Sequence, residues 1–153
     1  MRDALGGYFN LTMLIGFIVL VTALIALSLN FTKAYRVKNR VISYIEKYEG
    51  NIENEDMLSH TYDDLMALGY NGESQGIYYA TETAKNAGWT CPDFKGRRLG
   101  WCYQQVSSSK VKEGYVQYNV AVFINSHLPF IWTLFSQQFL WMKGTTTAIP
   151  VFK

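Results

Sequence analysis

Two cysteines are the residues of this 153-residue chain whose type and spacing most directly indicate covalent chemistry. Cys91 and Cys102 are separated by ten residues, among them Gly96 and Gly100. In an exported domain such a pair is expected to form a disulfide, and closing a short loop contributes about 2 to 3 kcal/mol in the chain-entropy model. Two free thiols in a protein core are the alternative, which a head inside the cell would favour. We predict the disulfide.

A zinc site would need more ligands than the cysteines provide, because structural zinc usually takes four. The histidines are His60 and His127, and neither has metal-ligand spacing to the cysteines or to the other. The sequence therefore predicts no metal and no cofactor.

The sequence also offers no convincing set of catalytic residues. Asp63 and Asp64 resemble a carboxylate pair, but neighbours on a helix point in different directions, and capping electrostatics explains acids in a first turn. The basic doublet Arg97–Arg98 is explained by an exposed turn after Gly96. The chain has no glycine-rich phosphate loop and no H-E-x-x-H motif. We expect a protein that is not an enzyme.

The element that would organise the chain is an uncharged stretch of twenty-nine residues, Ala4–Thr32. Its apolar centre, Leu11–Leu29, meets the length of about 20 residues that a helix needs to cross a bilayer. The hydroxyls of Thr12, Thr22 and Ser28 can bond to carbonyls of the same helix. Residues 8–32 are therefore predicted to be a transmembrane helix.

A cleavable secretory signal is the competing interpretation, because Ala26-Leu27-Ser28 is an acceptable cleavage site. The apolar run is longer than the roughly 7 to 15 residues of a signal core, and its basic leader is only Arg2, next to Asp3. We place this interpretation second.

The first seven residues form a short leader that ends in Gly6-Gly7 before Tyr8. Two small, flexible residues at this place are a candidate site for a leader peptidase, with Tyr8 or Gly7 as the new first residue. An ordinary unstructured terminus explains the composition more simply.

The helical pattern is predicted to continue over residues 33–49, because no proline or glycine follows until Gly50, which suits the position just after the helix end. An apolar stripe recurs at spacings of three and four, and it should pack against a sheet. The stripe comprises Ala34, Val37, Val41, Ile45 and Tyr48. Arg40 is assigned to the opposite face, where substitution should be tolerated. One helix over residues 8–49 would be about 63 Å long.

Residues 50–153 are enough for one globular head. We expect a helix near Thr61–Leu68, with Thr61 as its cap and Gly69 as its stop. Tyr115–Ile124 alternates, with Val116, Tyr118, Val120, Val122 and Ile124 on one face of a strand. Shorter strand candidates are Gly76–Glu82, Leu99–Val106 and Phe139–Val151. The predicted fold class is α+β: a long membrane-spanning helix packed on a small, mainly antiparallel sheet.

Charge is unevenly distributed along the chain, whose net charge is +2. Residues 33–49 carry five basic and two acidic side chains, whereas residues 50–153 carry eight basic and nine acidic ones. A near-neutral head argues against nucleic-acid binding, which needs a basic face. The basic cluster instead lies where anionic lipid head groups would be.

The segment Leu128–Met142 is rich in aromatic residues and has no charge. It is too short to be a second membrane span. Its rings either fill the core or touch lipid head groups or a neighbouring subunit, two settings that favour tryptophan and tyrosine. The candidate contact residues are Asn10, Phe130, Trp132, Phe135 and Trp141.

These features resemble a type IV pilin-like protein: a glycine-terminated leader, one membrane helix that becomes amphipathic, and a small sheet head. The alternating strand and proline-containing apolar segment of Tyr118–Trp132, followed by Gly144–Ile149, are similar to the ending of tight-adherence (TadE-like) minor pilins and pseudopilins. The resemblance implies a single-pass subunit of the bacterial cytoplasmic membrane with an extracytoplasmic head. Such a subunit belongs to a surface filament or a related secretion system.

Two features depart from that family. Its members usually carry a glutamate at the fifth residue after the cleaved glycine, whereas Thr12 stands there in this chain and Asn10 is the nearest strongly polar residue. The positive-inside rule also assigns the basic residues after Thr32 to the cytoplasm, whereas the resemblance and the cysteine pair assign the head to the outside.

The partners implied are the lipid bilayer and other pilin-like or envelope-complex subunits, in a homo- or hetero-oligomer, with no nucleic acid. The alternative function is a bitopic subunit of a conjugation or secretion channel, whose head docks onto a larger envelope complex without entering a filament.

Overall fold

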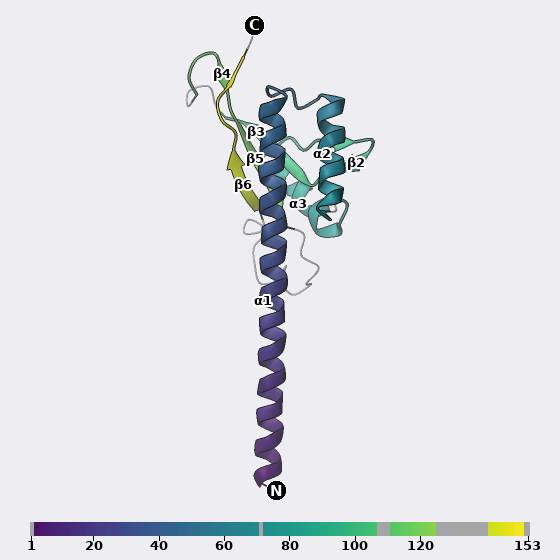
Figure 1. Cartoon of the computed structure of the whole chain (residues 1–153), viewed down its shortest axis with the longest axis vertical. Coiled ribbons are helices and arrows are strands. Elements are labelled where there is room, and N and C mark those ends of the chain that lie inside the picture. Colours follow the sequence, from purple (N-terminus) through teal and green to yellow (C-terminus); the bar gives the residue numbers. More distant parts are fainter. Residues whose placement is uncertain (1, 71, 107–110, 125–140, 152–153) are drawn as a thin grey trace.

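The computed structural model describes residues 2–70, 72–106, 111–124 and 141–151. One long helix, α1 (Arg2–Lys47), carries a small head of two further helices and short antiparallel strands (Figure 1). The predicted α+β class with a long N-terminal apolar helix is therefore confirmed. The remaining elements are α2 (Glu55–Ala67), α3 (Gln75–Asn86), β1 (Asp93–Phe94), β2 (Arg97–Arg98), β3 (Trp101–Gln105), β4 (Tyr115–Val116), β5 (Tyr118–Phe123), β6 (Trp141–Thr145) and β7 (Ile149–Pro150).

Helix α1 is 46 residues long and begins at Arg2, so the expectation of an unstructured leader over residues 1–7 is wrong for the described backbone of residues 2–7. Gly6 and Gly7 do not break the helix, because glycine in a helix interior costs only about 1 kcal/mol relative to alanine and no proline is present.

The end of α1 is a Schellman motif. The N–H of Gly50 donates to the carbonyl of Ile45 over 2.8 Å, and the N–H of Glu49 donates to that of Glu46 over 3.2 Å. Glu49, with φ 53°, occupies the left-handed position that we expected Gly50 to hold, and Gly50 follows with φ 78°. The predicted stop is therefore displaced by one residue.

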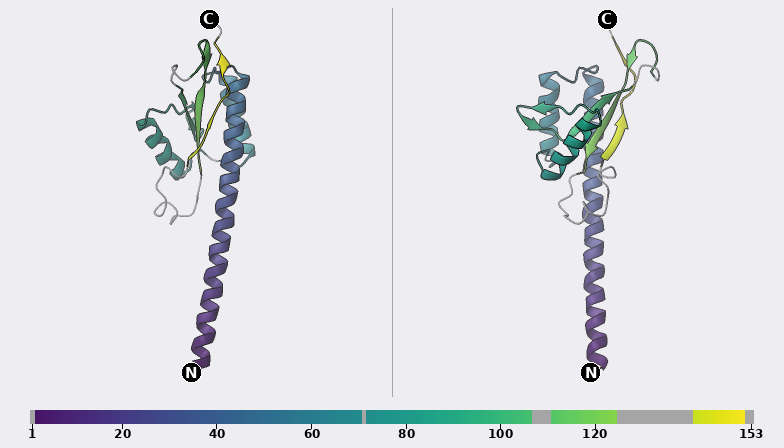
Figure 2. Two further views of the ribbon diagram at one scale, coloured as in Figure 1. Left: turned by 90° about the vertical axis from the view of Figure 1, so that its left-hand side faces the viewer. Right: turned by 180° about the vertical axis from the view of Figure 1, so that it is seen from behind.

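The central sheet has the order β3-β5-β6 and is antiparallel throughout. Helix α1 covers one face of it and α3 lies on the other (Figure 2). The consecutive residues of β5 from Val120 to Phe123 are all buried, as is Ile124 after them. The expectation of one buried face on this strand is therefore wrong, because both faces are covered by a helix.

Helix α2 begins earlier than predicted. Its cap is Asn54, whose Oδ1 accepts hydrogen bonds from the N–H groups of Asp56 and Met57. Thr61, the expected cap, lies inside the helix, where its buried hydroxyl donates to the carbonyl of Met57. The predicted stop is confirmed, because Gly69 has φ 66° and the N–H of the next residue bonds back into the last turn.

Helix α3 occupies the segment Gly76–Glu82, for which we predicted a strand. Its buried residues recur with helical spacing and face the core of the head: Ile77, Ala80, Thr81 and Ala84. The third strand candidate also differs from prediction, because its described part forms two strands. β6 joins the central sheet, whereas β7 pairs with β4.

Candidate functional site

The candidate functional surface is the part of α1 below the head, residues 7–32, which we call the apolar rod. Most of its large apolar side chains between Tyr8 and Leu29 are 52 to 72% exposed, whereas Val21 and Leu27 are half-buried. In the part of the chain that the structure describes, α1 is the one helix long and apolar enough to cross a membrane. Figure 1 shows the rod extending away from the head as a single helix.

The threonine hydroxyls of the apolar rod bond within the helix. The hydroxyl of Thr12 donates to the carbonyl of Tyr8 over 2.9 Å, and that of Thr22 donates to the carbonyl of Ile18 over 3.0 Å. Thr32 makes the same bond to Ser28. A hydrocarbon environment tolerates hydroxyls that are satisfied in this way.

The head is held to α1 by a seam that comprises Ala34, Val37, Val41 and Ile45. All four are at most 1% exposed. Tyr48, the last residue of the predicted stripe, is half-buried and packs against the same core. A side chain at Gly144 of β6 would approach the Cδ1 of Ile42 within 2.9 Å, so this strand lies directly against α1.

A polar contact ties α1 to α2. The Nε of Arg40 lies 2.9 Å from the Oδ2 of Asp64, and the hydroxyl of Tyr44 donates to the same oxygen over 2.8 Å. This bond and partial burial raise the pKa of Tyr44. Two expectations are corrected here. Asp64 lies in the last turn of α2 and not in its first turn. Arg40 lies on a face of α1 that contacts α2, so its substitution should not be tolerated as predicted.

The segment after α2 is fixed to the sheet by Tyr70. Its buried hydroxyl lies 2.7 Å from the carbonyl oxygens of both Gly100 and Phe123. Burial in this position raises the pKa of the phenol. A side chain on Gly72 would meet the carbonyl oxygen of Arg98 at 2.2 Å, so the two backbones approach as closely as only glycine allows.

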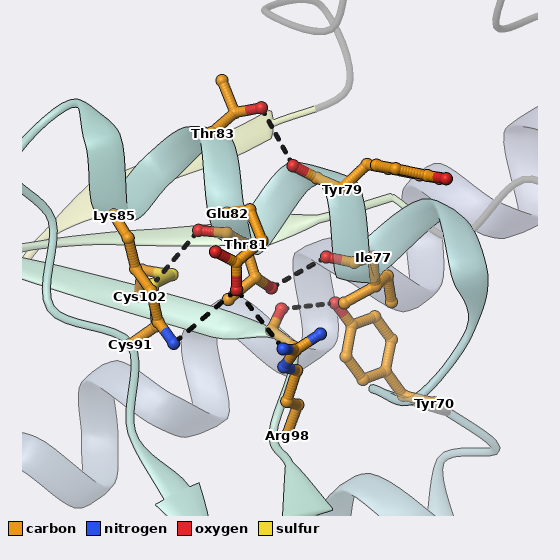
Figure 3. Close-up of a disulfide and its surroundings, with 11 residues drawn as sticks. Tyr70, Ile77, Tyr79, Thr81, Glu82, Thr83, Lys85, Cys91, Arg98 and Cys102 are labelled. Carbon is orange, nitrogen blue, oxygen red and sulfur yellow. Dashed lines mark hydrogen bonds and ion pairs between the residues drawn. A yellow bond between two sulfur atoms is a disulfide. The ribbon is translucent and has the colours of Figure 1, made fainter.

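The Cys91–Cys102 disulfide is present and ties the segment after α3 to β3 (Figure 3). Thr90 and Tyr103 exchange two backbone hydrogen bonds beside it, of 2.8 and 2.7 Å. The neighbouring antiparallel position places the two cysteines opposite each other, with their Cα atoms 4.1 Å apart.

The basic doublet is more structured than the predicted exposed turn. Lys95 and Gly96 form the turn, with φ 51° and 75°, and the doublet itself is strand β2. Arg98 lies over the ring of Tyr78, 3.9 Å from its centroid. Its Nη2 is 3.3 Å from Oε1 of Glu82 on α3 (Figure 3).

Of the aromatic contact candidates, Trp141 lies within the described residues, whereas Phe130, Trp132 and Phe135 lie outside them. The ring of Trp141 is half-buried and packs edge-on against Phe123, at 5.2 Å between centroids. For this residue the structure favours core packing. Asn10 is exposed on the apolar rod, as are Gly7 and Tyr8 of the predicted cleavage site.

One motif escaped sequence reasoning. Gly72-Glu-Ser-Gln-Gly76 has the G-x-S-x-G spacing of a hydrolase nucleophile elbow. The structure does not supply the context that this chemistry needs. Ser74 is the N-cap of α3 with an unstrained φ of −61°, it follows a turn rather than a strand, and no described group hydrogen-bonds to its hydroxyl.

A hollow at the base of the head was also not predicted. Its volume is about 300 Å³, and it lies between α1 and the end of α2. Its lining is Arg36, Asn39, Arg40 and Leu68. Because α1 and α2 meet only in the folded chain, sequence spacing held no signal for it.

Metal chemistry finds no support in the described ranges, where no three His, Cys, Asp or Glu side chains form a group that could hold an ion. His60 stacks on Tyr44 with 6.5 Å between ring centroids, and His127 lies outside the described residues. Comparison with protein families, with curated proteins and with solved structures finds no match to this chain.

Proposed function

We propose that this chain is a pilin-like structural subunit, anchored in the bacterial cytoplasmic membrane by its apolar rod, with the head on the outer side. One observation carries the proposal: a single continuous helix is apolar and exposed along its first part and is the packing partner of the head along its second. A soluble protein rarely leaves so large an apolar surface uncovered.

The arrangement of the head supports a structural role. Among the described residues, the head packs mainly on α1 from Ala34 onward, and most apolar side chains of the rod are left exposed to lipid or to the helices of neighbouring subunits. The disulfide suits an oxidising compartment outside the cytoplasm.

Assembly is tested by cross-linking between rods. Both native cysteines are in the disulfide, so a single introduced cysteine reports alone. We would replace Phe17, in the middle of the exposed rod, and treat cells and the sheared surface fraction with a thiol-specific cross-linker. The matched control is Lys112→Cys, at an exposed position on the head.

A pilin-like subunit is expected in the sheared filament fraction, with Phe17→Cys giving cross-linked dimers there and Lys112→Cys giving many fewer dimers. A chain that stays in the membrane fraction and cross-links only to larger envelope proteins would instead support the channel-subunit function. A chain recovered as a soluble monomer would contradict both.

A further inference from the structure

We propose that the hollow lined by Arg36, Asn39, Arg40 and Leu68, which we call the basal hollow, binds the phosphate of an anionic phospholipid. The inference rests on the proposed membrane anchoring and adds a specific lipid contact to it.

The basal hollow lies where the apolar rod ends. Helix α2 runs back along α1 from the far end of the head, so its C-terminal end faces the rod (Figure 1). Arg36 is four residues beyond Thr32, the last residue of the uncharged stretch, which is about 6 Å along the helix. The head-group layer is itself about 5 to 7 Å thick on each side of the hydrocarbon core.

Side chains of a helix lean toward its N-terminus. In α1 that direction leads from the head to the rod, so Arg36 and Arg40 lean toward the bilayer surface. The ammonium of Lys33 is placed at the same end of α2, because it lies 3.7 Å from the position that a Cβ on Gly69 would take.

The donors of the basal hollow remain available to a ligand. The described part of the chain gives Arg36 no ion pair, and its side chain is exposed. Arg40 contacts Asp64 through Nε, and a guanidinium has four further N–H donors. Guanidinium groups bind phosphate oxygens in pairs of parallel hydrogen bonds, and the side chain of Leu68 offers an apolar wall to the rest of a lipid.

The test measures lipid retention by the full chain in detergent, using native mass spectrometry at 0.5 M salt before buffer exchange. The lipids are palmitoyl-oleoyl phosphatidylglycerol and the zwitterionic phosphatidylcholine with the same chains. High salt screens diffuse attraction between exposed charges, whereas close hydrogen-bonded pairs persist. The variants are Arg36→Gln and the control Lys38→Gln, which removes the same charge from the half-buried side chain that lies over Tyr35.

The unmodified chain is expected to retain phosphatidylglycerol over phosphatidylcholine. Arg36→Gln should reduce that preference by about tenfold, as expected for one lost charge-assisted hydrogen bond, and Lys38→Gln should reduce it by less than about threefold. Equal losses in both variants, or no preference in the unmodified chain, would overturn the site.

Two further arms separate the sources of failure. Co-flotation with phosphatidylcholine vesicles tests anchoring alone. A chain that floats but shows no head-group preference would overturn the lipid site in the basal hollow and still support the proposed membrane-anchored function. A chain that does not float would overturn both the lipid site and the membrane anchoring. Displacement of bound phosphatidylglycerol by an excess of inorganic phosphate would assign the hollow to soluble phosphate and overturn the lipid proposal.

Discussion

Val41 is the residue whose substitution should most directly disrupt the packing of α1 against the head. Its side chain is fully buried in the seam. Val41→Asp would place an unpaired carboxylate there, and we expect the free energy of unfolding to fall by at least about 3 kcal/mol. Denaturant unfolding of the full chain in detergent measures the change.

Ser43→Asp is the matched control, because Ser43 is exposed two residues further along the same helix. It should change stability by less than about 0.5 kcal/mol. Arg40→Asp cannot serve, since the new carboxylate would face Asp64. If Ser43→Asp proved as damaging as Val41→Asp, α1 would not be bound to the head through this seam.

Tyr70 is the second residue whose substitution should measurably change stability, because its buried hydroxyl lies within hydrogen-bond distance of two carbonyl oxygens. Tyr70→Phe leaves both carbonyls without this donor and should lower the free energy of unfolding by about 2 kcal/mol. The exposed Tyr79 gives the control: Tyr79→Phe should have an effect below about 0.5 kcal/mol. Comparable losses in the two variants would contradict the role of this buried bond.

The pH dependence follows from the raised pKa of Tyr70. A phenol in the unfolded chain loses its proton near pH 10, whereas the native chain still holds it, so the native state binds more protons above that pH. The contribution of Tyr70 to the free energy of unfolding should therefore be constant below about pH 9, and the free energy of unfolding should fall above pH 10. In Tyr70→Phe the decline should be shallower by up to about 1.4 kcal/mol per pH unit, measured by unfolding at pH 9 to 11. An unchanged slope would show that Tyr70 is not the group responsible.

At the scale of elements, the disulfide joins the segment after α3 to β3. Replacing both cysteines with serine should lower the free energy of unfolding by about 2 to 3 kcal/mol. The unsubstituted protein with its disulfide reduced should have the same free energy of unfolding as the double variant, whereas the oxidised protein should be more stable. Thiol labelling of the denatured, unreduced chain should find no free thiol, and two labelled cysteines per chain would contradict the bond.

The long helix and the strand cores could be predicted because their patterns are long. Ala34, Val37, Val41 and Ile45 recur over several turns without a breaker, and residues 120–124, in and just after β5, form an unbroken apolar run. Helix α3 could not be separated from a strand so easily, since the β-favouring residues Tyr78, Tyr79 and Thr83 occupy exposed positions. Its signal was the helical spacing of Ile77, Ala80, Thr81 and Ala84.

Local polar chemistry was the harder part of the candidate site. The run Asn54-Glu-Asp was a good start for α2, but Thr61 offered a competing cap in the same helix. The contact of Arg40 with Asp64 and the basal hollow both need α2 to fold back along α1, so neither has a spacing in the sequence. Tertiary contacts of this kind are not encoded in local periodicity.

At the scale of the whole molecule, two arguments about topology oppose each other. The basic residues that follow the apolar rod would, by the positive-inside rule, keep the head in the cytoplasm. The disulfide and the proposed pilin-like role favour a head on the outside. The basal hollow bears on this conflict, because basic side chains that bind lipid phosphate are stable on either side of the membrane.

The most direct test of the account is the access of a membrane-impermeant maleimide to single cysteines in intact cells. Lys47→Cys, at the exposed end of α1 in the head, and Phe17→Cys, in the apolar rod, are compared in the same strain. We predict that Lys47→Cys is labelled in intact cells, whereas Phe17→Cys is labelled only after denaturation in detergent. Labelling of Lys47→Cys only after permeabilisation, or equal labelling of both positions in intact cells, would contradict a membrane-anchored subunit with its head outside.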